Sequence, residues 1–421
     1  MRRDVPGSGE PHEPGWVART FASLEVRNYR RFFTGQAISL VGTWMQSIAQ
    51  GWLVLELTGS ATWVGITIAL QTLPMLFLGP YGGLVADRVP KRQLLVATQA
   101  ASAVLAFVLF GLTASHTVTL DAVLVLALLL GIVNAFDNPT RQAFVREMVH
   151  AELVRNAVSL NSVLVNAARA VGPALAGVLI ATSGLAVCFL VNGLSYLAVI
   201  VAYIGMDGRS LWASPQVERG KRQVREGFAY VWRTAGLRIP LVMMTIVGTL
   251  TYEFQVSLPA LAKDTFGGGA EAYGWLTASM GVGAVVGGLW SATRSSTGVR
   301  TMVLAATTFG LTDLLVALSP TMPVASLALV ATGAASVWFL AAGNSTLQLT
   351  ADPVMRGRVM ALWAIAFLGT TPVGGPAIGW VAEHAGPRWA LAVGAVAALV
   401  AAGYGAHRAR LPGVLTPAPE A

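Results

Sequence analysis

Four ionisable residues stand within or at the ends of long apolar stretches: Arg169, Glu253, Asp137 and Glu56. A charge inside a membrane segment is costly, and such residues usually mark ion, proton or substrate pathways. We expect Glu253 or Glu56 to bind a proton or a cationic substrate group. Arg169 is then expected to bind an anionic group or to tune the pKa of that acid. The alternative is a static ion pair between helices, with Glu253, Asp137 or Glu56 as the partner of Arg169. Asp137 also lies four residues before Arg141, so these two can pair along one helix face.

Uncharged polar residues are scattered through the same apolar stretches. Pockets for amphiphilic ligands combine broad apolar walls with a few polar groups that orient the ligand. The residues predicted to line such a cavity are Gln46, Gln50, Asn166, Tyr252 and Gln255. Side chains of these types are equally suited to interhelical hydrogen bonds or, for the aromatic residue, to the membrane interface, and the sequence leaves these alternatives open.

The composition shows what must hold these side chains. The chain has 421 residues, of which 55% are hydrophobic and only 11% charged, and its mean hydropathy is +0.64. A soluble domain is usually about a quarter charged, so the sequence predicts an all-α polytopic membrane protein. Segments of about 20 apolar residues, enough to cross a bilayer as helices, fall near 32–57, 61–86, 93–114, 120–140, 156–181, 185–206, 239–262, 272–293, 299–318, 322–345, 358–382 and 388–406.

Basic residues give the expected orientation. Nearly all of the 28 Lys and Arg residues fall in loops on one side of the predicted spans, and short cytoplasmic loops are the ones that retain such charges. Both termini are therefore expected in the cytoplasm, on the inner side of a bacterial plasma membrane. The net charge of +8 is spread over loops and does not indicate nucleic acid. Residues 1–18 lack the apolar core of a cleavable signal, and one cysteine, Cys188, excludes an intrachain disulfide.

The stretch from Gly82 to Arg92 combines glycines, one acid and three cations between two apolar runs. We expect a tight hairpin at the membrane surface, with glycines that let two helices approach closely. Gly287-Gly288-Leu289 repeats Gly82-Gly83-Leu84, and Gly375-Pro376-Ala377 repeats Gly172-Pro173-Ala174. These echoes predict two related six-span bundles, residues 32–206 and 239–406, with a tail and lead-in at 1–31, a central linker at 207–238 and a tail at 407–421.

The hairpin motif, carried by Gly83, Asp87, Arg88, Lys91 and Arg92, together with the doubled halves, resembles the major facilitator superfamily, although Pro90 replaces the usual glycine. Residues 134–144, 225–230 and 356–360 resemble its enterobactin-exporter-like and macrolide-efflux-like branch. The resemblance implies a secondary transporter, working by alternating access, that exports a drug, siderophore or secondary metabolite against protons, as a monomer. An importer or uniporter of the same fold, a membrane enzyme and a transport-dead sensor are the alternatives.

The resemblance also assigns roles to single residues. Asp87, with Arg88 and Arg92, would latch the outward-facing state; the alternative is a plain cationic anchor. Gly172, Pro173 and Gly177 match the antiporter motif of the fifth span, where proline bends the helix. The arginine that many drug:proton antiporters carry in the fourth span is missing between Leu124 and Phe136. The ninth span is peripheral in this fold, so we expect Asp313 to be interfacial.

Other chemistries lack their motifs. The sequence contains no P-loop for ATP, and its five histidines lie in tails or loops without the spacing of metal ligands. No cofactor and no metal are therefore expected. The predicted partners are a small-molecule substrate, protons and the lipid bilayer.

Overall fold

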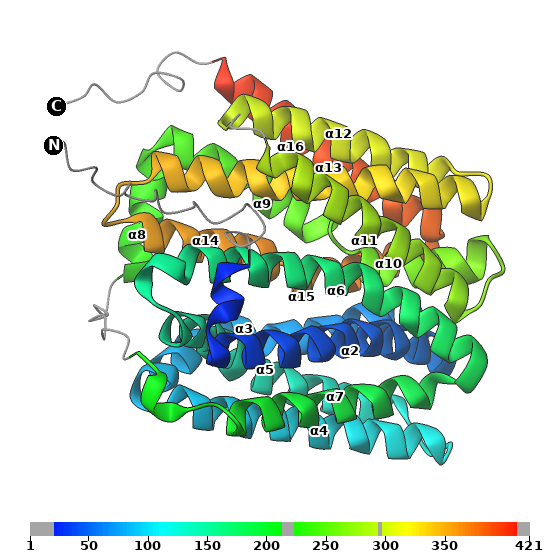
Figure 1. Ribbon diagram of the computed structural model, residues 1–421. Coiled ribbons are helices and arrows are strands. Elements are labelled where there is room, and N and C mark those ends of the chain that lie inside the picture. The colour runs from blue at the N-terminus through cyan, green and yellow to red at the C-terminus, as the bar shows by residue number, and fades with distance from the viewer. Residues whose placement is uncertain (1–20, 213–222, 294–296, 411–421) are drawn as a thin grey trace, which may run out of the picture.

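The computed structural model describes residues 21–212, 223–293 and 297–410, and within these ranges every regular element is a helix (Figure 1). The side chains of Pro80, Asn166, residues 223–225, Ala292 and Leu368 also lie outside the description. The tails at 1–20 and 411–421 and the middle of the predicted linker lie outside the described residues.

The first part of the chain forms six long helices. They are α2 (Arg27–Thr58), α3 (Ala61–Arg88), α4 (Lys91–Ala114), α5 (Leu120–Met148), α6 (Val154–Ser183) and α7 (Leu185–Ile204), with short 3-10 turns η1 (Ala22–Glu25), η2 (Ala151–Leu153) and η3 (Gly208–Ser210) at one end. Gly59 ends α2 in the left-handed conformation at φ 65°, and the Ser60 side chain accepts a hydrogen bond from Trp63 N to begin α3. This two-residue connection fixes α2 and α3 as antiparallel neighbours.

The second part contains α8 (Gln223–Arg233), α9 (Ala235–Leu250), α10 (Phe254–Ala260), a π-helical turn η4 (Leu261–Thr265), α11 (Ala270–Ala292), α12 (Val299–Leu318), α13 (Met322–Thr350), α14 (Arg356–Leu368), α15 (Thr371–His384) and α16 (Pro387–Ala409). By length and composition, 11 segments of the described chain can cross a membrane, counting Ala235–Thr265 and Arg356–His384 as one segment each. The remaining predicted span, 32–57, is α2. Its arginines and glutamines make it the most polar of the spans. The all-α polytopic class predicted from the sequence is confirmed, while the predicted count of twelve spans depends on α2, which is not among these 11 segments.

The helical bundle has two ends. The end that we call the α8 face carries α8, the start of α2 and the end of α16, and the opposite face carries the α2–α3 and α12–α13 connections (Figure 1). Helices α2 to α7 pack mainly on one another, and so do α9 to α16. The most extensive contacts between these halves are those of α3 with α15 and of α6 with α11, and α10 also packs on α2 and α3. The predicted domain boundaries stay predictions.

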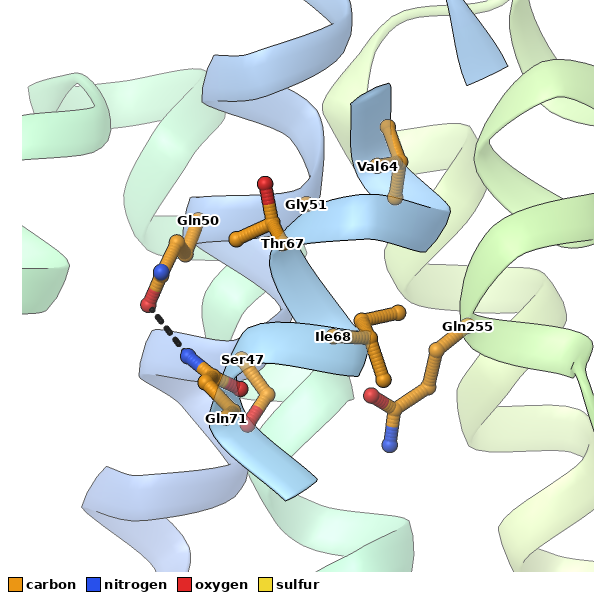
Figure 2. Close-up of a pocket in the computed structure, with 8 residues that line it drawn as sticks. All are labelled: Ser47, Gln50, Gly51, Val64, Thr67, Ile68, Gln71 and Gln255. Carbon is orange, nitrogen blue, oxygen red and sulfur yellow. Dashed lines mark hydrogen bonds between the residues drawn. The ribbon is translucent and has the colours of Figure 1, made fainter. Parts of the chain in front are cut away.

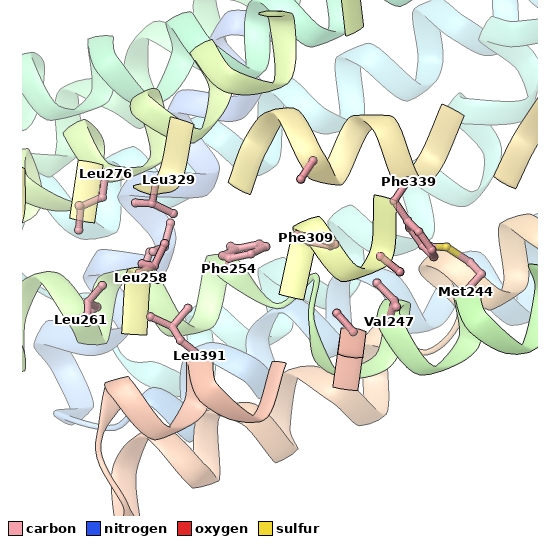
Figure 3. Packing of buried hydrophobic residues seen from close by; sticks show 14 of the residues in the cluster. Met244, Val247, Phe254, Leu258, Leu261, Leu276, Phe309, Leu329, Phe339 and Leu391 are labelled. Carbon is pink, nitrogen blue, oxygen red and sulfur yellow. The ribbon is translucent and has the colours of Figure 1, made fainter. Parts of the chain in front are cut away.

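The apolar core is largest in the second half. Phe254, Leu258, Phe309, Phe339 and Met244 lie fully inside it, between α9, α10, α12 and α13 (Figure 3). A smaller cluster around Tyr29, Phe32, Phe144 and Tyr203 lies in the first half. Each half therefore has buried aromatic packing of its own, apart from the contacts between halves.

The two most extensive contacts between halves, named the α3–α15 seam and the α6–α11 seam, are built from glycines on both sides. A Cβ at Gly65 of α3 would overlap the backbone of Gly375 in α15, and one at Gly274 of α11 would lie 2.8 Å from Gly177 Cα in α6. Gly172 lies more than one turn before Gly177 in α6 and packs on α2, where an added Cβ would meet Trp44. The expected close approach of a partner helix at Gly172 and Gly177 is confirmed, beside the in-helix Pro173.

Candidate functional site

Two of the predicted spans are interrupted. The expectation of continuous helices over 239–262 and 358–382 is wrong, because Thr251–Glu253 separates α9 from α10 and Gly369–Thr370 separates α14 from α15. In the second case Pro372 has no N–H to donate to the preceding turn, which favours a break there. At the first break, the Thr251 hydroxyl donates to Gly394 O in α16 at 2.8 Å. Broken helices in transporters commonly line substrate and ion sites.

Glu253 lies on the first of these breaks. Its side chain is 4% exposed, and it faces the backbone of Gly374 and Gly375, where a Cβ would lie 2.9 Å from Oε1 and 3.5 Å from Oε2 respectively. Oε1 is buried and accepts no hydrogen bond in the described part of the chain. The two glycines of α15 thus make room for the Glu253 carboxyl group. If this group is ionised, its Oε1 has no hydrogen-bond donor in the described part of the chain.

A small pocket opens beside this break, between α2, α3 and α10 (Figure 2). Its lining is uncharged, mixes polar and apolar residues, and consists of Ser47, Gln50, Gly51, Val64, Thr67, Ile68, Gln71 and Gln255. Gln71 Nε2 donates to Gln50 Oε1 at 3.1 Å, while the Gln255 amide reaches in from the second half without a partner among the described residues (Figure 2). Amide side chains from both halves therefore meet at this small pocket.

The predicted cavity residues divide into two groups. Gln50 and Gln255 line the pocket, together with Gln71. Gln46 instead accepts from Asn192 Nδ2 of α7 at 2.7 Å, and the Tyr252 hydroxyl donates to Ser336 O of α13 at 2.7 Å. For these two the alternative of an interhelical hydrogen bond is the one observed. The side chain of Asn166 lies outside the described set.

Arg169 is held by an aromatic ring and pairs with none of the predicted acids. Its guanidinium carbon lies 4.9 Å from the ring centroid of Trp44 in α2, a cation–π contact. Its Nε is buried and donates no hydrogen bond within the described residues. Glu56 is exposed at the opposite face, where it accepts from Trp52 Nε1 at 2.7 Å. The predicted static ion pair of Arg169 is therefore not found in the described chain.

Asp137 anchors a hydrogen-bond network inside the first half. Its Oδ1 accepts from Thr98 Oγ1 at 2.7 Å and from Gln99 Nε2 at 2.9 Å, while its Oδ2 lies 3.6 Å from Arg141 Nε. Arg141 also donates to Gln36 Oε1 at 3.0 Å. The expected pairing of Asp137 with Arg141 along one helix is confirmed. This acid is thus satisfied by donors, in contrast to Glu253.

The hairpin motif is tighter than expected, since only Val89 and Pro90 separate α3 from α4. Lys91 Nζ pairs with Glu147 of α5 at 2.7 Å. Arg92 donates to Ile204 O at 2.8 Å and to Met206 O at 3.2 Å, at the end of α7.

These bonds bear on the latch hypothesis. Both Lys91 and Arg92 are held inside the first half, so Arg92 does not bridge the halves in this arrangement. Gly83 is buried, Asp87 is half-buried and Arg88 is exposed. Gly82 packs on α5, where a Cβ would overlap Ala135 O, so the close helix approach expected of this motif is confirmed at Gly82.

A carboxylate joins the two halves at the opposite face. Glu383, near the end of α15, accepts from Ser60 Oγ and from Thr62 Oγ1, both at 2.5 Å, at the start of α3. A carboxylate at a helix N-terminus is also favoured by the helix dipole. The only signal in the sequence is an acid near the end of the eleventh span, and nothing there reveals its partners more than 300 residues away.

Eleven candidate spans and the more polar helix α2, with two interrupted helices and a small pocket between two helical halves, define a polytopic membrane protein in the described part of the chain. The chain belongs to the transmembrane secretion effector family of the major facilitator superfamily, whose family model matches residues 18–418. The resemblance drawn from the hairpin motif is therefore confirmed.

Individual relatives are distant. The staphyloferrin A transporter of Staphylococcus aureus is 25% identical over 256 residues, covering 61% of this chain and 64% of its own. The chain thus matches slightly less than two thirds of that relative. The multidrug efflux pump Tap of Mycolicibacterium fortuitum is 27% identical over 366 residues, covering 82% of this chain and 87% of its own.

Solved structures share the fold. The nucleoside transporter NupG covers 91% of this chain and 99% of its own at a TM-score of 0.73 and 12% identity. A bacterial homologue of the iron transporter ferroportin, in an inward-facing state, has the same coverage with a TM-score of 0.72 and 14% identity. At these identities the likeness concerns the arrangement of helices alone.

Proposed function

We propose that this protein is a secondary active exporter that moves an amphiphilic small molecule out of the cell in exchange for protons. One observation carries the proposal: Glu253 is buried with an unsatisfied oxygen on a break in the seventh span. An unpaired buried carboxylate is strongly disfavoured relative to its neutral acid. Glu253 therefore binds a proton in the closed arrangement and releases it when the site opens to water.

The proton site and the pocket share one short segment. Gln255, which reaches into the pocket, stands two residues after Glu253 on the first turn of α10. A ligand that draws the Gln255 amide toward itself moves the segment that holds the acid. Binding of substrate and loss of the proton are thereby coupled through the backbone of residues 251–255.

The substrate class follows from the lining and from the relatives. The pocket offers amides and hydroxyls on an apolar wall and no charged side chain, which suits a ligand with several neutral hydrogen-bonding groups. The relatives are named for multidrug efflux and for transport of staphyloferrin A. To this chain we assign export of a drug, siderophore or secondary metabolite.

The two halves provide the motion. Bundles 32–206 and 239–406, joined by the linker 207–238, rock about the α3–α15 and α6–α11 seams. The α8 face is cytoplasmic, in the bacterial plasma membrane, because the basic loops gather there, and the protein acts as a monomer. The Glu383 contacts then close the outer side, while Asp87 and Arg88 lie at the inner side, in keeping with the latch hypothesis.

Accumulation of a labelled macrolide in cells that express the protein tests this function. Wild type should lower accumulation, and a protonophore should abolish the effect. Glu253→Gln should abolish it too, whereas Glu56→Gln, which changes an exposed acid bonded within its own helix, should not. Membrane abundance must be equal in all samples. Unchanged export by Glu253→Gln would remove Glu253 from the mechanism, and higher accumulation with wild type would identify an importer.

A further inference from the structure

Asp313 of α12 is buried without a partner among the described residues. It is 1% exposed, and neither Oδ1 nor Oδ2 accepts a hydrogen bond in the part of the chain that the structure describes. The expectation that Asp313 is interfacial is wrong, because its side chain faces α16 and the end of α9 rather than the membrane surface. The proposed coupling through Glu253 makes no use of this acid.

The surroundings of Asp313 are the carbonyl end of a half-helix. At Gly394 of α16, a Cβ would lie 3.2 Å from Asp313 Oδ2, 3.1 Å from Leu250 O and 3.3 Å from Thr251 Cα. Leu250 is the last residue of α9, so its carbonyl stands where a helix runs out of intrahelical donors. The missing side chain of Gly394 therefore lets a carboxyl group approach the start of the break in the seventh span.

Within the described residues, no cation balances an ionised Asp313. On α16, Arg388 donates to Ala317 O at 3.0 Å and to Ser319 O at 2.7 Å and is thereby held at the end of α12. At the break between α9 and α10 the ionisable groups are Tyr252, which donates to Ser336 O, and Glu253, which faces α15. Arg238 lies at the opposite end of α9 and donates to Trp232 O. Helix α13 has no ionisable residue between 322 and 350.

The helix end itself also disfavours an anion. The C-terminus of a helix carries a partial negative charge, and an unpaired buried carboxylate costs several kcal/mol. A neutral carboxyl group is favoured at this helix end, because its O–H can donate to a carbonyl that lacks a partner. Asp313 and the end of α9 thus complement each other only when the acid carries a proton.

We propose that Asp313 is a second proton-binding site, distinct from the substrate pocket, whose neutral carboxyl group donates to the carbonyl end of α9 and holds the break at residues 251–253. Protonation converts the carboxylate to a carboxylic acid with no other change of bonding. The proposal goes beyond the exporter function and stands for any substrate.

Infrared spectroscopy of the full chain in lipid nanodiscs tests this directly. Aspartate is labelled with carbon-13 at the side-chain carboxyl group, so that the carbonyl stretch of a protonated aspartic acid is separated from that of glutamic acids. At neutral pH the wild type should show this band, and Asp313→Asn should lose it completely. Asp137→Asn is the matched control, because Asp137 is the other buried aspartate of the described spans and is satisfied by donors; it should keep the band.

Further variants distinguish a proton site from a purely structural side chain and from a sodium site. Asp313→Glu should remove the band from aspartate-labelled protein and add intensity in glutamate-labelled protein beyond the signal that Glu253 gives in wild type. This gives a reading even if the Asn variant does not fold. Asp313→Asn should keep the thermal unfolding midpoint because its amide N–H still donates, whereas Asp313→Leu should lower it. No band in the wild type, or a band that persists in Asp313→Asn, overturns the proposal. The proposal is also overturned if the thermal unfolding midpoint is higher in sodium than in choline for the wild type but not for the Asp313 variants. That result would identify an ionised carboxylate that binds sodium.

Discussion

Glu383→Gln should open the outer side of the protein more often. In the structure the carboxylate accepts two hydrogen bonds of 2.5 Å from Ser60 and Thr62, and both cross from α15 to α3. A glutamine side chain keeps the shape of the acid but offers one neutral acceptor in place of two charged ones. Both bonds cross between the halves, so their loss is expected to act on the equilibrium between this arrangement and one in which α3 and α15 separate.

The size of the effect follows from the exposure of the site. Hydrogen bonds to a charged group contribute about 1.5–3 kcal/mol when sheltered, but Glu383 is exposed, and exposed ionic contacts contribute about 0.2–1 kcal/mol. We take about 1 kcal/mol for the pair of bonds, because Ser60 is buried. This corresponds to about a fivefold shift toward the open state.

Labelling of a single cysteine measures that shift. Cys188 is the only cysteine of the sequence and is buried, so Cys188→Ala removes the background with little cost. Thr67→Cys then places a thiol in the pocket, where the native side chain is 3% exposed in the closed arrangement. A membrane-impermeant maleimide added outside intact cells should react about five times faster in the Glu383→Gln background.

Glu56→Gln is the control for this measurement. It makes the same chemical change at the same face, but Glu56 accepts from Trp52 of its own helix. Its labelling rate should stay at the wild-type value. Equal acceleration by both variants, or none by Glu383→Gln, would show that the bonds between α15 and α3 do not hold the outer side closed.

Two more changes test the packing. Gly65→Val should lower the thermal unfolding midpoint and speed labelling from outside, because its side chain would overlap the backbone of Gly375. Overpacking of this kind costs about 1–3 kcal/mol. Gly79→Val is the control and should change neither value, because an added Cβ at Gly79 has no neighbour within 4 Å. Asp137→Asn should lower the midpoint by an amount equivalent to about 1.5 kcal/mol, through weaker bonds from Thr98 and Gln99, without speeding the labelling. An unchanged midpoint in Asp137→Asn, or an equal effect of the two glycine variants, would contradict these assignments.

The sequence predicts the helices better than their interruptions. The expected span 299–318 coincides with α12, because apolar length and flanking polar residues are local properties. The fourth span is expected to end at 140, whereas α5 continues to Met148, since a helix can extend past the apolar segment into a polar region. The breaks at 251–253 and 369–370 are not predicted, because two or three residues do not change the hydropathy of a span.

The direction in which a side chain points is the harder problem. Gln46 and Gln50 are one helical turn apart on α2, yet Gln46 bonds to α7 and Gln50 lines the pocket. Asp313 is misplaced by the sequence because its position is inferred from the place of its helix in the fold, which says nothing about the face that it occupies. The role of Glu383 depends on contacts between distant segments, and spacing along the chain does not contain that information.

The seams have a consequence for how such a protein can diversify. Where Gly65 meets Gly375 and Gly177 meets Gly274, the backbones of the two halves lie in direct contact. At these positions any added side chain would push the halves apart, so the contact requires glycine whatever the protein transports. The pocket is lined by different residues, so its three glutamines can be replaced without changing these glycine contacts. Ligand choice can change by a few substitutions while the moving parts stay the same.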